Sequence, residues 1–412
     1  VGTEYIAVPN TKEENKERRF LIDPMAYQDA EDLADEKGLS IISIVHSHPD
    51  HPDKPSEFDK NHAWPRFSYI IMSIKKPPRI CCNLTSIMPE FSPQRWLIYA
   101  LGGGLGHFHR AIAMGRAATS RGHYIKILTN SRFANLIPWK NEIKKNTEVK
   151  IIPHSANPRE TIQQIYNNLN YDDYDRLIVD TFPRGLAGEL PALIGGIKKP
   201  KILVNRYIKP SYIENFNLFE EIKKYDLIFS IEQIAPFTNC TNSISTDPWL
   251  ICNSNELLSK IMARCRLKID PKDNRPLIVV CGTGNHSDID YFNSLTKKLK
   301  LEIKDWIVRL TSPIPNVGDL NAWPLLQLMQ GIEVLVGAGG YNIVHESRAT
   351  GTPLLALPKV RLYDNQLKRL KNSETFKSIN HLIDQLPLHP LPNKSIEFKN
   401  GVVQAAKLIE GF

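Results

Sequence analysis

Cysteine is scarce in this sequence, and the cysteines present lack the spacing of a structural framework. Six occur among 412 residues, and no two of them form a Cys-x-x-Cys pair. Disulfide scaffolds and zinc ribbons depend on regularly spaced pairs. The sequence therefore indicates reduced thiols, and we expect the protein to work in the cytoplasm.

Long apolar runs are missing too. No run in the sequence reaches the roughly 18–20 residues that a membrane-spanning helix requires. The hydrophobic fraction of 42% and the charged fraction of 23% are ordinary for a globular protein, and the 412 residues predict about two or three domains. Because the sequence opens with Val1 directly before a strand-like segment, we expect the natural N-terminus to lie further upstream.

Basic runs interleaved with aromatic residues, the usual mark of a nucleic-acid surface, are absent as well, so we expect no nucleic-acid partner. The net charge of +8 is uneven. Residues 1–80 hold 11 Lys and Arg against 14 Asp and Glu, and the remainder holds 41 against 30. The basic part suits an anionic nucleotide-sugar or peripheral contact with acidic lipids on the inner face of a membrane. Solvated lysines on helix faces would give the same charge.

The segment HSHPDHPDKPSEFD holds the most specific pattern in the chain. Strand-like stretches at residues 4–9 and 19–22 come first, then a helix from Pro24 to about residue 37 and an apolar strand over residues 39–45. His46 and His48 alternate by two, so their side chains point to the same side. Two imidazoles and the carboxylate of Asp59, with a fourth position open to water, would make a catalytic zinc site. Ser56 precedes Asp59 by three residues and would hydrogen-bond an oxyanion.

This His-x-His-x7-Ser-x2-Asp spacing resembles the JAMM motif of the MPN (Mov34/PAD-1) metalloprotease family over residues 1–76. The resemblance implies a partial α+β domain in which His46, His48 and Asp59 bind Zn²⁺ and Ser56 supports the oxyanion. It also implies a peptide or ubiquitin-like substrate. The family's general-base glutamate has no clear counterpart, since Glu4 is the only acidic residue in the opening strand. We therefore expect zinc binding with weak or absent peptidase activity.

Residues 77–93 are expected to form a linker. Four prolines punctuate this stretch, and proline at such density blocks helices and central strands.

Residues 94–248 read as alternating strands and helices, typical of a parallel α/β domain. A buried-type strand over residues 95–101 leads into a glycine loop that contains Gly103, Gly104 and Gly106, and a helix is expected from about residue 109. His107 ends the loop and would project over the carboxyl edge of the sheet, either as a general base or only as a helix cap. Asp180 ends a later strand and is either a site residue or a helix cap.

Residues 249–412 repeat the α/β pattern, around the segment VGAGGYNIVHESRATGTPLLALPKVRLYDNQLKR. Gly337, Gly339 and Gly340 follow a short buried strand and precede a helix near Tyr341. Such a turn exposes backbone amides beside the positive end of a helix dipole, which makes an anion site. An ordinary strand–helix crossover would explain the glycines equally well. Gly282, Thr283 and Gly284 form a second turn, after the strand at residues 276–281.

Two facing doubly wound domains describe the GT-B architecture, and the sequences GGGLGH and GAGGYNIVHE, with GTPLLALP and YDNQ, resemble the peptidoglycan N-acetylglucosaminyltransferase family over residues 94–412. The resemblance implies an acceptor domain (residues 94–248) and a nucleotide-sugar donor domain (249–412). It assigns His107 to the acceptor hydroxyl and Glu346 to the ribose hydroxyls. The turn from Gly337 to Asn342 would bracket the diphosphate, and Asp364 and Gln366 would contact the donor sugar. The other residues expected at the donor site are Gly103, Gly104, Gly106, Gly282, Thr283 and Gly284. The acceptor is not identified by the sequence, and a lipid-linked compound and a small molecule both stay open.

The sequence thus favours a glycosyltransferase that moves a hexose from a nucleotide-sugar, with inversion and without a metal, joined to a JAMM module. A zinc-dependent isopeptidase with the larger part as scaffold is the alternative. An epimerase or sugar-nucleotide binder of the same fold is a third, with Asp180 and Glu189 as its candidate acid and base.

Overall fold

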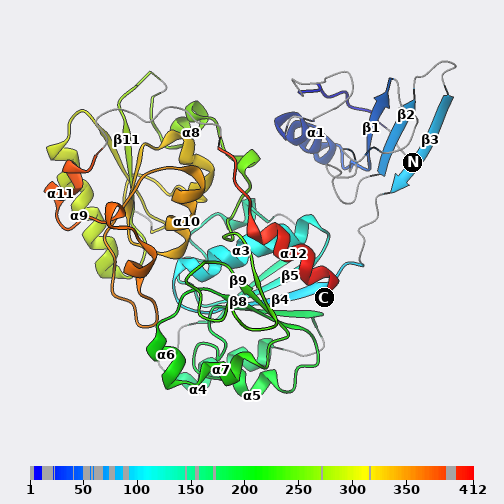
Figure 1. The fold of residues 1–412 in the computed structure, drawn as a ribbon. Helices are drawn as coiled ribbons and strands as arrows, with labels where there is room; N and C mark the ends of the chain where they lie inside the picture. The colour runs from blue at the N-terminus through cyan, green and yellow to red at the C-terminus, as the bar shows by residue number, and fades with distance from the viewer. Residues whose placement is uncertain are drawn as a thin grey trace. The chain divides into compact units, whose positions relative to one another are not determined.

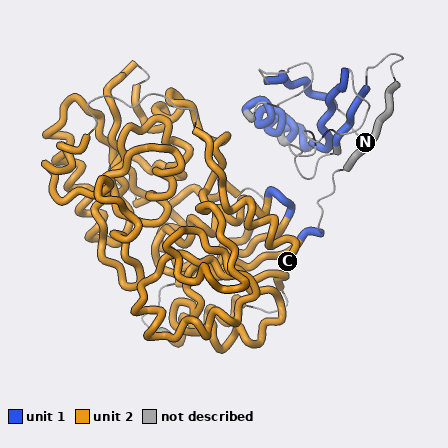
Figure 2. Tube along the Cα trace, viewed as in Figure 1, with its two compact units in different colours: residues 1–93, 120–122 blue, residues 94–119, 123–412 orange. Residues whose placement is uncertain are grey.

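The chain forms two compact units, residues 1–93 with 120–122 and residues 94–119 with 123–412 (Figure 2). The computed structural model describes residues 4–11, 22, 24–39, 41–49, 56, 59, 68–73, 79–86, 92–143, 146–153, 157–169, 173–270, 272–314, 317–386 and 396–412. Among these residues, no helix is long and apolar enough to cross a membrane.

Among its described residues, the first unit contains helix α1 and a three-stranded sheet (Figure 1). Helix α1 (Pro24–Glu36) is followed by Gly38, whose φ of +65° suits a glycine after a helix. Strands β1 (Ser43–His48) and β2 (Ser68–Ser73) pair in parallel, and β3 (Arg79–Ser86) pairs antiparallel with β2.

Three expectations for this unit are corrected. Residues 77–93 are not only a linker, because β3 lies among them; the prolines flank the Arg79–Ser86 run instead of interrupting it, so its amides stay available for pairing. Residues 4–9 form no strand, and residues 10 and 22 share a single bridge. Strand β1 begins at Ser43 and includes both histidines. The expected strand at residues 19–22 lies mostly outside the described residues.

The second unit begins with a seven-stranded parallel sheet in the order β10-β9-β8-β7-β4-β5-β6. Its strands are β4 (Arg95–Ala100), β5 (Tyr124–Thr129), β6 (Thr147–Ile151), β7 (Arg176–Asp180), β8 (Lys201–Asn205), β9 (Leu227–Ser230) and β10 (Ser243–Ser245). The central strands are continuous apolar runs with almost every side chain buried, as a sheet covered on both faces requires.

Helices cover both faces of this sheet (Figure 1). One face packs against α4 (Pro158–Asn168), α5 (Leu190–Ile194), α6 (Pro210–Asn215) and α7 (Leu218–Ile222). The other packs against α3 (Leu105–Ser120) and the C-terminal α12 (Gly401–Gly411). The sequence placed helix α12 in the donor domain, but its contacts are with the first sheet. For example, Gln94 Nε2, just before β4, donates to Glu410 O at 3.0 Å.

A four-stranded parallel sheet follows in the order β12-β11-β13-β14, with α9 (His286–Glu302) on one face and α10 (Tyr341–Thr350) on the other. Its strands are β11 (Leu277–Cys281), β12 (Ile307–Thr311), β13 (Val334–Gly337) and β14 (Leu354–Ala356). The remaining elements are η1 (Trp139–Asn141), η2 (Ser254–Glu256), α8 (Lys260–Arg266), η3 (Leu325–Gly331), η4 (Gln366–Arg369), η5 (Asn372–Glu374) and α11 (Ile379–Asp384). One hydrophobic cluster contains residues of both sheets, so the two halves share a core.

Helix boundaries account for most of the other differences from the sequence. Helix α3 begins at Leu105 instead of residue 109, so His107 lies in its first turn rather than in a loop. Residues 210–222 form two short helices, α6 and α7, because Asn217 between them has a φ of +46°, which interrupts the helix. Helix α5 begins at Leu190, after a loop that faces the site.

Candidate functional site

Each parallel sheet of the second unit reverses its strand order at one point, and ligands of open α/β sheets bind at the carboxyl ends of the strands there. In the first sheet the reversal lies between β4 and β7. Strand β4 leads into the start of α3, and β7 ends at Asp180. In the second sheet it lies between β11 and β13, which lead into the turns at residues 282–285 and 338–340.

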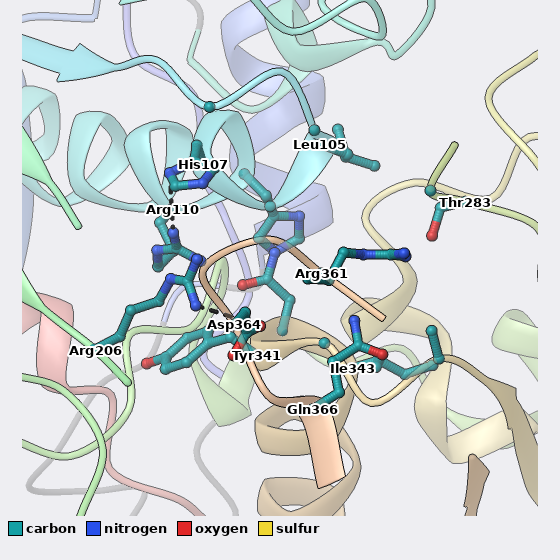
Figure 3. Close-up of a pocket in the computed structure, with 18 of the residues that line it drawn as sticks. Leu105, His107, Arg110, Arg206, Thr283, Tyr341, Ile343, Arg361, Asp364 and Gln366 are labelled. Atoms are coloured by element: carbon teal, nitrogen blue, oxygen red, sulfur yellow. Dashed lines mark hydrogen bonds and ion pairs between the residues drawn. The ribbon is translucent and has the colours of Figure 1, made fainter. Parts of the chain in front are cut away.

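A cavity of about 720 Å³ lies among these loops, within the usual range for a small-molecule site. Figure 3 shows His107 and Arg110 projecting from α3, with Arg361, Asp364 and Gln366 on the segment after β14. The cavity brings together most of the residues predicted from the sequence, namely Gly104, Gly106, His107, Thr283, Gly284, Gly340, Asn342, Glu346, Asp364 and Gln366.

Four predicted glycines do not line the cavity: Gly103, Gly282, Gly337 and Gly339. Their amides are partly committed to the protein itself. Gly103 N donates to Asn130 Oδ1 at 2.8 Å, Gly282 N to Thr311 O at 2.8 Å and Gly339 N to Gln366 Oε1 at 3.1 Å. These residues shape the turns, and Gly340 at the start of α10 is the one that reaches the cavity from the glycine segment.

His107 is paired with Asp180 across the strand reversal. Its Nδ1 lies 2.6 Å from Asp180 Oδ2, and Arg110 holds the same carboxylate with Nε at 2.9 Å and Nη2 at 2.7 Å. Burial raises the pKa of Asp180, but Arg110 and His107 outweigh it and hold that pKa well below its usual range. An ionised carboxylate only accepts hydrogen bonds, so Nδ1 of His107 carries the proton and Nε2 is left as the basic nitrogen.

Burial lowers the pKa of His107, although Asp180 opposes the shift. The imidazole is therefore neutral at pH 7 and able to accept a proton. The ring packs against Gly102, where an added Cβ would lie less than 3.0 Å from its Cδ2, Nε2 and Cε1 atoms. Glycine at this position is thus what allows the ring to lie flat beside Asp180.

Arginines and carboxylates form a buried network beneath the cavity. Arg369 donates to both carboxylate oxygens of Glu232, from Nε at 2.7 Å and from Nη2 at 3.0 Å. Its Nη2 also donates to Asp364 Oδ1 at 3.3 Å. Arg206, from the half of the second unit that contains the seven-stranded sheet, places its Nη1 3.5 Å from Asp364 Oδ2, as the dashed line in Figure 3 marks. Asp364 is therefore a bridge between the halves as well as a cavity residue.

Asn342 and Glu346 lie four residues apart on α10, so they share one face of the helix. Both line the cavity, and among the described residues Asn342 Oδ1 and Glu346 Oε1 are buried with no hydrogen-bond partner. His109 Nε2 is 2.9 Å from Glu346 Oε1, a close contact without hydrogen-bond alignment. The other ring nitrogen, Nδ1, accepts from Trp323 Nε1 at 3.2 Å.

Gln366 is fixed by its carbonyl oxygen, which accepts from Gly339 N at 3.1 Å and from Lys359 N at 2.8 Å. Its amide nitrogen is the end left for a ligand. The sequence did not single out Arg110, Arg206, Glu232 or Arg369. Arg110 follows His107 by one helical turn and was detectable by that spacing, whereas no local pattern marks the others.

In the first unit, His46, His48 and Asp59 come together as the spacing predicted. The Nε2 atoms of the two histidines are 3.2 Å apart, and they lie 3.5 and 3.3 Å from the oxygens of Asp59. Tetrahedral zinc with ligands at 2.0–2.1 Å places those ligands about 3.3–3.4 Å apart, so the three side chains fit this ion.

Ser56 lies beside this cluster but is engaged with Asp59. Its Oγ and its backbone N both donate to Asp59 Oδ2 at 2.7 Å, and Asp59 N donates back to Oγ at 3.1 Å. Burial raises the pKa of Asp59, but these hydrogen bonds and the histidines lower it overall. Ser56 therefore orients the carboxylate of Asp59 in this arrangement. Glu4 pairs with Lys37 at 2.7 Å.

Comparisons with known proteins agree with these two folds. Residues 1–85 match a family described as prokaryotic homologs of the JAB domain. No curated protein matches the sequence. Similar solved structures include the glycotransferase of kitacinnamycin, at 12% identity over 78% of this chain and 99% of that chain, with a TM-score of 0.51.

Two further structures are MurG of Acinetobacter baumannii (11% identity, 78% and 100% of the two chains, TM-score 0.48) and HepE of Anabaena with UDP and glucose (11%, 77% and 95%, TM-score 0.46). The chain therefore has an N-terminal JAB-like domain and a GT-B glycosyltransferase fold, as expected from the sequence. At this identity the structural likeness concerns the fold.

Proposed function

We propose that residues 94–412 are a glycosyltransferase that moves a hexose from a nucleotide-sugar to a hydroxyl acceptor, with inversion and without a metal. Residues 94–248 bind the acceptor and residues 249–400 bind the donor, while α12 braces the first sheet. The observation that carries the proposal is the pairing of His107 with Asp180 in a cavity that the N-terminus of α10 also enters.

The donor side rests on α10. The amides at its N-terminus and the positive end of its dipole suit a diphosphate. Arg361 lines the same side of the cavity. Asn342 Oδ1 and Glu346 Oε1 are buried acceptors without hydrogen bonds, and leaving such groups unpaired costs about 1–3 kcal/mol each. Two hydroxyls of a ribose would satisfy both, and Gln366 would reach the sugar with its amide nitrogen.

The chemical step follows from the basic nitrogen of His107. Nε2 takes the proton of the acceptor hydroxyl as its oxygen bonds to the anomeric carbon. The bond from that carbon to the diphosphate breaks on the opposite face, which inverts the configuration. The electron pair passes to the diphosphate, where amides and arginine stabilise the charge. Asp180 stabilises the imidazolium that forms on His107.

For residues 1–85 we propose a zinc site made of His46, His48 and Asp59, with weak or absent peptidase activity. A zinc ion there would polarise a carbonyl and a bound water. The acidic side chain of the opening segment, Glu4, is paired with Lys37, and within the described part of the chain no glutamate joins the cluster to serve as base. Cleavage of a peptide or ubiquitin-like substrate remains the alternative activity of this domain.

The test is donor binding, measured by calorimetry with UDP-glucose, GDP-mannose and dTDP-glucose. We expect one of them to bind, and Glu346→Ala to weaken its binding about tenfold or more through the lost hydroxyl contact. Glu302→Ala, at the exposed end of α9, is the matched control. Failure of all three donors to bind, or an unchanged affinity in Glu346→Ala, would contradict the donor assignment.

A further inference from the structure

The acceptor side of the cavity is walled by aromatic rings from both halves of the second unit. Phe182 follows β7, Tyr212 lies on α6, and Tyr363 lies on the segment after β14. The rings of Tyr212 and Tyr363 are 4.2 Å apart, and Phe182 meets each of them edge-on at 5.9 Å. The His107 ring lies 5.3 Å from Phe182, so the wall begins directly beside the basic nitrogen.

Among the described residues, four arginines line this cavity, and three of them face a carboxylate. Arg110 pairs with Asp180, Arg206 with Asp364, and Arg361 with Asp288. Arg184 has no such partner among the described residues. Its Cζ lies 4.7 Å from the centre of the Phe216 ring, and its Nε is buried without a hydrogen bond. A guanidinium stacked on a ring keeps its edge free, and that edge matches a carboxylate.

The loop that carries Arg184 is held firmly from below. Leu186 N donates to the hydroxyl of Tyr99 at 2.8 Å, and that hydroxyl donates to Glu189. Ala187 N donates to Glu189 Oε2 at 2.9 Å, and the Tyr225 hydroxyl donates to Pro183 O at 2.8 Å. Tyr99, Glu189 and Tyr225 are buried, so Arg184 sits on a preorganised support and the cost of ordering it on binding is low.

We infer that the acceptor is a small planar aromatic compound that carries both a hydroxyl group and a carboxylate. The ring stacks against Phe182, Tyr212 and Tyr363, the hydroxyl meets Nε2 of His107, and the carboxylate pairs with Arg184. The inference rests on the proposed glycosyltransferase function. A sugar acceptor fits this wall less well, because it presents hydroxyls around its rim where Leu186, Ala187 and Leu362 have no group to pair with them.

The step balances without any further reactant. The O–H bond of the phenol breaks and its proton passes to His107 Nε2. The phenolic oxygen forms a bond to the anomeric carbon, and the bond from that carbon to the nucleoside diphosphate breaks with its electron pair. The products are an aryl glycoside and the nucleoside diphosphate, and His107 returns its proton to solvent.

The experiment uses the full chain with whichever of UDP-glucose, GDP-mannose and dTDP-glucose binds it. Release of nucleoside diphosphate is measured with 4-hydroxybenzoate and 4-hydroxyphenylacetate, with their methyl esters, and with methyl glucoside and a polyprenyl phosphate. We expect the free acids to give a kcat/KM about tenfold or more above their esters, as the loss of a charge-assisted hydrogen bond predicts. Arg184→Gln should remove that preference by raising KM for the acids, while donor affinity stays unchanged.

Two variants control the comparison. Arg184→Lys keeps the charge and should keep part of the preference, and Arg159→Gln, at an exposed position on α4, should keep all of it. Equal turnover of acids and esters, an equal loss for both in Arg184→Gln, or turnover confined to the sugar or the lipid phosphate would overturn the inference while leaving the glycosyltransferase intact. Absence of binding by all three donors would overturn the proposed function, and this inference with it.

Discussion

Gly102→Ala is expected to disable the site by moving one ring. Position 102 has no positive φ, so alanine adopts its backbone conformation without strain. The new Cβ would nevertheless lie less than 3.0 Å from three atoms of the His107 imidazole. That ring cannot simply turn aside, because His107 is buried and its Nδ1 is 2.6 Å from Asp180. The clash must break this hydrogen bond or displace the start of α3.

The magnitude follows from what the hydrogen bond and the base contribute. A hydrogen bond to a charged group contributes about 1.5–3 kcal/mol, and a similar loss of unfolding free energy is expected. A positioned general base contributes about 10²- to 10⁴-fold to rate, so kcat should fall about a hundredfold or more. Donor affinity should change little, because the donor side of the cavity lies on α10.

The assay compares kcat, donor affinity and thermal unfolding in Gly102→Ala and in a matched control. Gly195→Ala serves as the control, since its φ is −63° and an added Cβ there meets nothing within 4 Å. A Gly102→Ala enzyme with normal kcat would refute the assignment of His107 as the base. A variant that loses donor binding and activity together would instead point to general disruption of the cleft.

The other predictions concern the donor carboxylate, acid stability and zinc. His109→Gln should weaken donor binding several-fold with a smaller change in kcat, because glutamine cannot both accept from Trp323 and face Glu346. Calorimetry with the donor measures this effect. An unchanged donor affinity would show that His109 only fills space. Burial lowers the pKa of both His107 and His345 below the ordinary value of 6.5. As the pH falls, the unfolded chain therefore binds protons at these histidines before the folded chain does. The free energy of unfolding should then fall below about pH 6.5, by up to about 1.4 kcal/mol per pH unit for each histidine. Urea unfolding between pH 5 and 8 measures it, and a flat profile, or one unaltered in His345→Gln, would contradict the reasoning. His48→Ala should abolish stoichiometric zinc binding in equilibrium dialysis, whereas His286→Ala, at an exposed position, should retain it; equal zinc content in both variants would place the metal elsewhere.

The fold was largely predictable because its signals are local. Buried parallel strands are short apolar runs that can be read from the sequence, as in β7 (RLIVD) and β8 (KILVN). The start of α3 was missed because glycine at position 106 and histidine at 107 are weak helix formers, and tertiary packing of the first turn outweighs their propensity. Strand β3 was missed because prolines around it obscured the run between them.

The candidate site was predictable only where a reactive or polar residue lies close in sequence to a glycine turn after a strand. His107, Asn342 and Glu346 lie next to glycine turns, so a sequence pattern places them at the mouth of the sheets. The partners that set their properties come from distant segments: Asp180 is 73 residues from His107, and Glu232 is 137 residues from Arg369. No period or motif encodes such pairs, because they depend on which strands become neighbours.

Asp180 illustrates how the structure separates two equally simple interpretations. From the sequence it was either a helix cap or a site residue. A cap accepts hydrogen bonds from backbone amides at a helix start. Asp180 instead accepts from the side chains of Arg110 and His107, both on α3, and its strand neighbours β4 at the reversal of the sheet. The strand order thus places a carboxylate beside the histidine. Asp180→Asn should therefore lower kcat far more than it lowers donor affinity, because the amide could also hold the wrong tautomer of His107. An unchanged kcat in that variant would show that the pair is only structural.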